Sequence, residues 1–346
     1  MKLDFRRTGK RAACARPWAE FIAACALVVG CKQPAPSSSG CAETTGATCD
    51  AGHCQITLAV CQDPEAIAVS PAGVFWTDHG QPGGRPPGVR TVPLGGGVVT
   101  TLASTDFWVG GIAVNSDKVF WTNGHLGTVM SVSIGGGAVT TLASGQSSPD
   151  FIAADDTNVY WTNAGTTAQG YYDGAVMMVP VGGGAPVTLA AGLPHPEAIA
   201  IDAVNVYWGN ALSDLQSVMK IPRAGGVAMV LGPGAGQHFG IAVYGTSVYW
   251  TNYDAGTLMK APIVGGALTT LASAQDRPTG LAVDGENVYW VNGTTLMRMP
   301  LGGGPAAPVA SGLGGLFPAI ALDATSVYYL SGGGAVRDQL WKLTPK

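Results

Sequence analysis

Residues 158–163 read Asn-Val-Tyr-Trp-Thr-Asn (NVYWTN), and this short stretch returns along the chain at near-regular intervals. Its other copies are VFWTD at 74–78, VFWTN at 119–123, VYWGN at 206–210, VYWTN at 248–252, VYWVN at 288–292 and a worn copy, VYYL, at 327–330. The second aromatic residue of each copy, from Trp76 to Tyr329, recurs every 39 to 47 residues. A period in this range is typical of a repeat architecture.

Each repeat contains four short segments with strand-forming composition. A small, apolar segment such as GIAV (240–243) precedes the aromatic one, and a third such as TLMKAP (257–262) follows a variable loop. A fourth, such as LTTLAS (268–273), ends the unit. Gly-rich turns such as Gly-Gly-Gly at 95–97 separate the last two segments and supply the positive φ values that hairpins need. This pattern predicts the four-stranded blades of an all-β propeller.

Seven copies of the first segment predict a seven-bladed β-propeller of four-stranded blades. The seventh unit ends at its third segment, residues 340–343, but a matching fourth segment, ITLA at 56–59, lies before the first unit. We therefore expect this N-terminal strand to complete the last blade and remove an open sheet edge. Cys54 and Cys61 flank the strand, so a disulfide between them would reinforce this seam.

The aromatic motif and its preceding apolar segment resemble the YWTD repeats of the LDL-receptor class of β-propellers, and more loosely the NHL-type propellers. The resemblance covers about residues 55–346 and implies the propeller fold. It differs in copy number, because the YWTD propeller has six blades and this chain has seven units. Since one propeller fold hosts enzymes, receptors and scaffolds, the motif is specific for the fold and weak for function.

Residues 1–30 predict an export signal. Six Lys or Arg residues lie in the first 16 positions, and the apolar run at 21–30 is too short to span a bilayer. The run ends in Leu-Val-Val-Gly before Cys31, which resembles a bacterial lipobox; an ordinary signal peptide with an incidental cysteine is the alternative. The resemblance implies a lipoprotein cleaved before Cys31 and lipidated on its thiol. Lys32 at the next position implies sorting to the outer membrane.

Residues 31–54 are expected to form the lipidated cysteine, a flexible tether and a cysteine-rich segment, and residues 55–346 the propeller. Besides Cys31, four cysteines would remain in the exported chain: Cys41, Cys49, Cys54 and Cys61. An even number in an oxidising compartment predicts two disulfides, with three possible connectivities. A metal-binding knuckle is the alternative, although the sequence contains no CxxC pair.

The charge balance argues against nucleic acid as a partner. The formal net charge is −4, and the first 30 residues hold six basic and two acidic side chains, a net of +4. The remainder therefore carries −8, whereas nucleic-acid binding needs a basic surface. We expect contact with a membrane through the lipid anchor, and no nucleic-acid partner.

Polar residues just before the first segments are candidates for a site at the channel mouth. Four of them stand at or within one residue of equivalent positions: Glu65, Asp150, Glu197 and His238. Facing one another across a channel, they could hold Ca²⁺ or Mg²⁺ or act as acid and base. This pattern resembles the metal-binding residues of propeller lactonases and lyases, which use carboxylates or a histidine in this way. The alternative is that each carboxylate only accepts backbone hydrogen bonds in a turn.

Loops that follow the aromatic segments supply candidates for contact with a partner. They are His79, Arg85, His125, Tyr171 and Tyr172, the last two at a loop tip and of a type enriched at interfaces. The Asn or Asp that ends the aromatic motif recurs in six units, which predicts a structural role in bonding nearby backbone.

The sequence therefore favours a non-enzymatic binding or scaffolding lipoprotein of the cell envelope, which would take a protein or glycan partner on its loop face. The alternative is a divalent-cation-dependent, lactonase-like propeller hydrolase or lyase with its site at the channel mouth. The two differ in whether three or four of the mouth residues converge within metal-bond reach.

Overall fold

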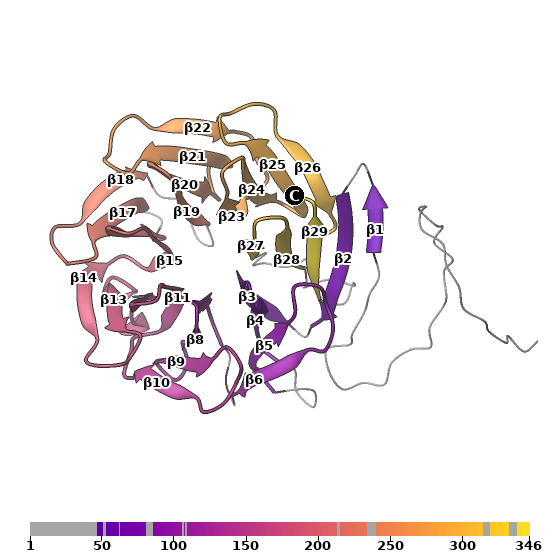
Figure 1. Cartoon of the computed structure of the whole chain (residues 1–346). Coiled ribbons are helices and arrows are strands. Elements are labelled where there is room, and N and C mark those ends of the chain that lie inside the picture. The colour runs from indigo at the N-terminus through magenta and orange to yellow at the C-terminus, as the bar shows by residue number, and fades with distance from the viewer. Residues whose placement is uncertain are drawn as a thin grey trace, which may run out of the picture. The chain divides into compact units, whose positions relative to one another are not determined.

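Each aromatic motif forms the second strand of an antiparallel sheet in the computed structural model of the chain, and six of these sheets have four strands and the seventh has five (Figure 1). The structure describes residues 47–50, 53–61, 63–80, 86–105, 107, 109–212, 215–233, 240–313, 319–331 and 338–346. All of them belong to the unit Ser38–Lys346. These residues form seven sheets, so the predicted all-β propeller with seven blades is confirmed.

The first three blades follow one another along the chain. Blade 1 contains β3 (Pro64–Ser70), β4 (Gly73–Asp78), β5 (Gly88–Val92) and β6 (Thr100–Ser104). Blade 2 contains β7 (Ile112–Val114), β8 (Lys118–Asn123), β9 (Thr128–Ser133) and β10 (Thr140–Ala143). Blade 3 contains β11 (Pro149–Ala154), β12 (Asn158–Asn163), β13 (Gly174–Pro180) and β14 (Val187–Leu193), with the short 3₁₀ helix η1 (Thr167–Gln169) in the loop before β13.

The remaining blades keep the same order. Blade 4 contains β15 (Pro196–Ile201), β16 (Asn205–Asn210), β17 (Ser217–Pro222) and β18 (Met229–Pro233). Blade 5 contains β19 (Ile241–Tyr244), β20 (Ser247–Asn252), β21 (Thr257–Pro262) and β22 (Thr269–Ala272). Blade 6 contains β23 (Thr279–Val283), β24 (Asn287–Asn292), β25 (Thr295–Pro300) and β26 (Ala307–Ser311). Blade 7 contains β27 (Ile320–Leu322), β28 (Val327–Ser331), β29 (Gln339–Thr344) and β2 (His53–Val60).

The first strand of every blade lines the centre of the ring. Each first strand contacts the first strand of the next blade, in the order β3, β7, β11, β15, β19, β23 and β27, and β27 contacts β3. Figure 1 shows these strands around a common centre, with the later strands of each blade farther out. The ends at which the first strands begin therefore meet on one face.

The two aromatic residues of each motif hold neighbouring blades together. Side chains alternate between the two faces of a strand, so Phe75 and Trp76 on β4 point to opposite sides of blade 1. Trp76 packs with Tyr328 of blade 7, and Phe75 packs with Trp121 of blade 2. The same pairing of a Tyr or Phe with the aromatic residue of the next blade occurs at all seven interfaces between the described blades.

The predicted N-terminal strand closes the ring. β2 pairs antiparallel with β29, and Thr57 lies opposite Trp341. The strand covers His53–Val60, longer than the expected 56–59, and a further strand, β1 (Ala47–Asp50), pairs with its outer edge to give a five-stranded sheet. In Figure 1 the indigo and violet N-terminal strands lie beside yellow β29.

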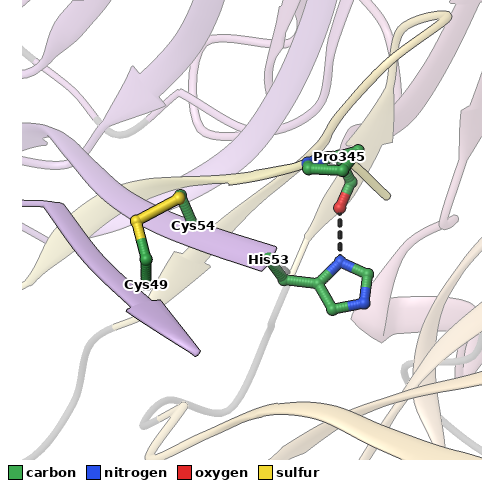
Figure 2. The surroundings of a disulfide bond; sticks show 4 residues. All are labelled: Cys49, His53, Cys54 and Pro345. Atoms are coloured by element: carbon green, nitrogen blue, oxygen red, sulfur yellow. Dashed lines mark hydrogen bonds between the residues drawn. A yellow bond between two sulfur atoms is a disulfide. The ribbon is translucent and has the colours of Figure 1, made fainter. Parts of the chain in front are cut away.

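The disulfide at this seam differs from the expected one. Cys54 is bonded to Cys49, which lies directly opposite it on β1, so the expected bridge between Cys54 and Cys61 is wrong. Figure 2 shows this bond and, beside it, the His53 Nδ1 hydrogen bond of 2.6 Å to the carbonyl of Pro345. Cys61 is buried, and Cys41 lies outside the described residues. The prediction of two disulfides therefore stays a prediction.

The expected signal peptide at 1–30 and lipidated Cys31 also lie outside the described residues. Within the part of the chain that the structure describes, we find no helix long and apolar enough to cross a bilayer.

Candidate functional site

The wall of the central channel is apolar, except at one end, where acidic side chains line it. Each blade lines the channel with two consecutive residues near the start of its first strand: a Gly or Ala, replaced by Phe in blade 3, and then an Ile or Leu, as in Ala66 and Ile67. The channel holds a cavity of about 260 Å³. Glu65 and Asp150 also line it, at the positions where blades 1 and 3 begin.

A second cavity, of about 650 Å³, lies beside the channel between blades 1 and 3, and we call it the mouth cavity. Its lining includes Glu65 and Asp150, which are therefore shared with the channel. Its other polar and aromatic lining residues are His79, His125, Ser148 and Phe107. Two of the predicted metal ligands and two of the predicted partner-contact residues thus meet in one place.

Backbone packing between blades fixes Asp150 at this position. The hydroxyl of Thr122, the Thr of the blade 2 motif, donates a 2.5 Å hydrogen bond to the carbonyl of Asp150. The N–H of Gly111 donates to the same carbonyl at 3.1 Å. A Cβ on Gly111 would lie only 2.8 Å from that oxygen, so the close approach of blades 2 and 3 requires glycine here. A Cβ on Gly110 would lie 3.5 Å from Asp150 Oδ1, so the absent side chain leaves room beside the carboxylate.

His79 forms the wall of the mouth cavity next to Glu65. Its Nε2 lies 3.1 Å from the carbonyl of Val109, to which it donates a hydrogen bond, and 3.5 Å from Glu65 Oε2. Its Nδ1 lies 3.7 Å from Asp63 Oδ2. The histidine is therefore held in place by blade 2 and borders two carboxylates of blade 1.

The two carboxyl groups of the mouth cavity are hard to ionise. Burial raises the pKa of Glu65 to about 7, and the nearby carboxylates of Asp150 and Asp63 add to this rise. Burial likewise raises the pKa of Asp150 to about 6. Among the described residues, neither carboxylate has an ion pair with Lys or Arg.

Aspartates at the opposite ends of the blades have lowered pKa values instead. Burial there would raise the pKa of Asp202, but hydrogen bonds from the Tyr207 hydroxyl at 2.6 Å and from nearby backbone N–H groups lower it. Asp323 has the same kind of environment, with the hydroxyl of Tyr328 at 2.6 Å. Carboxylates in these hairpins stabilise the turns, whereas the described residues supply no such donors to the mouth carboxylates. Strongly raised pKa values in a cavity are typical of functional sites.

Glu197 does not join Glu65 and Asp150. It is buried, lines neither cavity, and its Oε1 lies 3.4 Å from Nδ1 of His195. The ring of His195 packs against Tyr171 at 5.0 Å between centroids. His238 lies outside the described residues. No group of three or more His, Cys, Asp or Glu in the described part of the chain could hold a metal ion, so the four-ligand metal site stays a prediction.

The partner-contact candidates differ in their surroundings. His125 is exposed and stacks on Phe107, with 4.5 Å between ring centroids. Tyr172 is 46% exposed at the tip of the loop after β12, which Asp173 ties down by accepting hydrogen bonds from Thr166. Arg85 lies outside the described residues. These positions leave the partner-contact assignment a prediction.

Two residues that matter here were not singled out from the sequence. Phe107 lies in a connection whose length differs between repeats, so no repeat position points to it. Arg90 is fully buried, with its Nε 3.7 Å from Asp78 Oδ2, and it stands opposite Trp76. The equivalent partners of the other five tryptophans are all Met, so a comparison of the repeats could have found Arg90.

The Asn or Asp that ends the motif bonds nearby backbone, as predicted, in four of the six units, whereas Asn163 and Asn210 accept from the indole N–H of the motif Trp instead. The carboxylate of Asp78 accepts from the N–H of Gly80, and the side-chain oxygens of Asn123 and Asn252 accept from backbone N–H groups three residues on. These side chains shape the loops around the mouth.

Comparison with known proteins supports the fold and no narrower class. No family model matches the chain, and the search of curated proteins found no match. A chain in the crystal structure of a nidogen/laminin complex is similar, with a TM-score of 0.51 and 19% identity over 62% of this chain and 86% of that one. The computationally designed Ika8 protein gives a TM-score of 0.58 and 18% identity over 80% and 83%.

A putative TolB from Agrobacterium tumefaciens gives a TM-score of 0.47 and 13% identity over 61% of this chain and 83% of that one. At such identities the similarity to the nidogen/laminin and designed structures concerns the fold alone. The fold and the mouth cavity together define a seven-bladed β-propeller with an acidic cavity beside its channel.

The raised pKa of Glu65 predicts a stability that falls as the pH rises. The ordinary value is 4.5 and the folded value about 7, so the folded protein resists ionisation throughout this window and the full penalty is present above pH 7. We expect Glu65→Gln to raise the free energy of unfolding by about 1–3 kcal/mol at pH 8, and by little near pH 4.5. Urea unfolding at both pH values measures this.

Glu286→Gln is the matched control, because Glu286 is exposed in the hairpin between β23 and β24, at the opposite ends of the strands. It should change stability by less than about 0.5 kcal/mol at either pH. A Glu65→Gln protein that is less stable than the parent at pH 8 would contradict the raised pKa.

Proposed function

We propose that the protein is a non-enzymatic binding module of the cell envelope, held there by a lipid on Cys31 and sorted to the outer membrane. The mouth cavity receives a chemical group of a glycan or protein partner. One observation carries this proposal: Glu65, Asp150, His79 and His125 line a single open cavity on the face where the strands of the ring begin.

The construction of the cavity supports binding by a preformed site. Glu65 and Asp150 stand on the innermost strands, and the interblade contacts of Thr122 and Gly111 fix the backbone at Asp150. Sites built on strands keep their geometry better than sites built on loops alone. A pocket of several hundred Å³ that combines apolar walls with a few convergent polar groups is a usual place for a ligand.

The stability cost of the two carboxyl groups also supports a function. Ionised groups buried without a partner are destabilising, and Gln or Asn would fill the same space without that cost. Two other blades use Gly or Thr at the equivalent positions, Gly110 and Thr279, so the fold itself does not need an acid there. We therefore assign these side chains to recognition.

The lipid anchor predicts a change in partitioning. Cells that express the full chain with Cys31→Ala should lose incorporation of labelled palmitate, and the protein should move from the membrane fraction to the soluble fraction. Intrinsic Trp fluorescence serves as the folding control, since the six motif tryptophans are fully buried. Palmitate labelling that persists in the variant would refute the assignment of Cys31.

Binding at the mouth cavity predicts site-specific crosslinking. A photoreactive phenylalanine analogue in place of His125, which is exposed in the cavity lining, should give adducts with envelope components in intact cells. The same analogue at Glu286, at the opposite ends of the strands, is the control. A glycan panel tested against the full chain in detergent covers the case of a glycan. Adducts at position 286 alone, with no glycan bound, would contradict the proposal.

A lactonase-like hydrolase or lyase that depends on Ca²⁺ or Mg²⁺ is the second candidate. The observation in its favour is that two carboxyl groups with pKa values near 7 and 6 share one cavity, as acid–base catalysis requires. If such a site formed with His238, about 1 mM Ca²⁺ or Mg²⁺ should raise the melting temperature, and Asp150→Asn should abolish the shift. A metal-dependent shift and turnover of lactones would place this candidate first, and absence of both would reject it.

A further inference from the structure

We propose that the mouth cavity binds a small organic amine, with its ammonium group between Glu65 and Asp150 and its carbon skeleton against Phe107 and His125. This inference rests on the proposed binding function and names the chemical class of its ligand. The juxtaposition that carries it is a pair of carboxylates beside an aromatic wall in one cavity.

The carboxylates lack the partner that their environment calls for. Asp150 has no side-chain hydrogen bond in the described part of the chain, and Glu65 has only His79 at 3.5 Å. Asp63 adds a third acid next to His79. The residues described around the cavity therefore supply negative charge without a Lys or Arg to balance it. A cation from outside would relieve both the burial and the mutual repulsion of the two groups.

Space for that cation comes from blade 2. Gly110 and Gly111 occupy the strand start between Glu65 of blade 1 and Asp150 of blade 3, so these two positions place no side chain between the two acids. A Cβ on Gly110 would already lie 2.8 Å from the hydroxyl of Thr122, which rules out a larger residue without rearrangement. Blade 2 thereby leaves a gap in which a ligand could bridge the carboxylates of Glu65 and Asp150.

The ligand set suits an ammonium group better than a bare metal ion. Calcium needs six to eight oxygen ligands and magnesium an octahedral set, whereas the described residues bring only two carboxylates to the cavity. An ammonium group has three donors and can be satisfied by two carboxylates and a water. Phe107, 40% exposed and stacked on His125, offers an aromatic face to the attached carbons and attracts cations.

The same geometry links binding to protons. An ammonium ion prefers both carboxyl groups ionised, and both are partly protonated near neutral pH because burial raises the pKa of Glu65 to about 7 and of Asp150 to about 6. Affinity should therefore rise as the pH rises through this range, with release of protons on binding. The other titratable groups that face them are Asp63, His79 and His125.

The test is calorimetric titration of the full chain in detergent with 1,5-diaminopentane and with glucosamine. The neutral controls are 1,5-pentanediol and N-acetylglucosamine, which keep the skeletons and remove the charge. We expect at least one amine to bind at about pH 8, and its neutral control to bind roughly ten- to a hundredfold more weakly. Asp150→Asn and Glu65→Gln should each weaken amine binding by a similar factor, while Glu286→Gln should not.

A second readout separates a charge effect from a folding effect. Titrations of the parent chain in buffers of different ionisation enthalpy should show proton release near pH 6.5, and affinity should drop about tenfold or more by pH 5.5. Binding of the diamine alone would indicate an aliphatic amine, and binding of glucosamine alone an amino sugar; either supports the inference. Equal binding of the neutral controls, or no binding by either amine, overturns it.

Failure of the inference is distinguishable from failure of the proposed function. If position 125 still gives crosslinks to an envelope partner while no amine binds, the cavity is a binding site for a different ligand. If neither amine nor partner is found at the cavity, both fail together.

Discussion

The packing of one blade's Tyr or Phe against the motif aromatic of the next blade is the interaction on which the whole ring depends. A single strand provides both contacts, because its two adjacent aromatic residues face opposite sides of the sheet. All six motif tryptophans are fully buried. Each fully buried aromatic side chain contributes on the order of 2–3 kcal/mol through the hydrophobic effect. Seven such interfaces in a closed ring leave no blade with an uncovered face, and β2 supplies the last strand of the last blade.

Once the aromatic pairs fix the blades, the ends of the inner strands are free to vary. The Thr that follows Trp in the motif fixes the backbone at these strand ends. The hydroxyl of Thr77 donates a hydrogen bond to the carbonyl of Gly110, and that of Thr122 to the carbonyl of Asp150, each in the next blade. Side chains at these starts are therefore held by backbone contacts and need not stabilise the fold themselves. The unusual residues of the mouth, two acids and a glycine pair, lie at such starts.

Repetition explains which parts of the structure were predictable from the sequence. The period predicted the four strands of each blade, the number of blades and the seam, because each rests on hydrophobic contacts that every repeat must make; β1 lies outside the repeat and was not predicted. The repeat register also placed Glu65, Asp150 and Glu197 at equivalent strand starts. It could not tell that Glu197 lies beside His195 while the other two face a cavity, because the repeat pattern does not show which side chains of neighbouring segments surround each acid. Phe107 and the Cys49–Cys54 pairing lie outside the repeat altogether, so no comparison of units could find them.

The two ends of the blades show how one residue type can serve structure at one end and function at the other. Aspartates in the hairpins opposite the mouth, such as Asp202 and Asp323, receive hydrogen bonds that lower the pKa and stabilise tight turns. Within the part of the chain that the structure describes, the acids of the mouth receive no comparable donors, and burial raises the pKa of both. A ring that is stable through its aromatic interfaces can tolerate such a local cost. This cost occurs where Gly110 and Gly111 leave space between the two acids. Residues that differ from the other repeats and carboxyl groups that are unfavourably buried therefore lie in the same cavity. Their coincidence is the strongest physical argument that the cavity recognises a ligand.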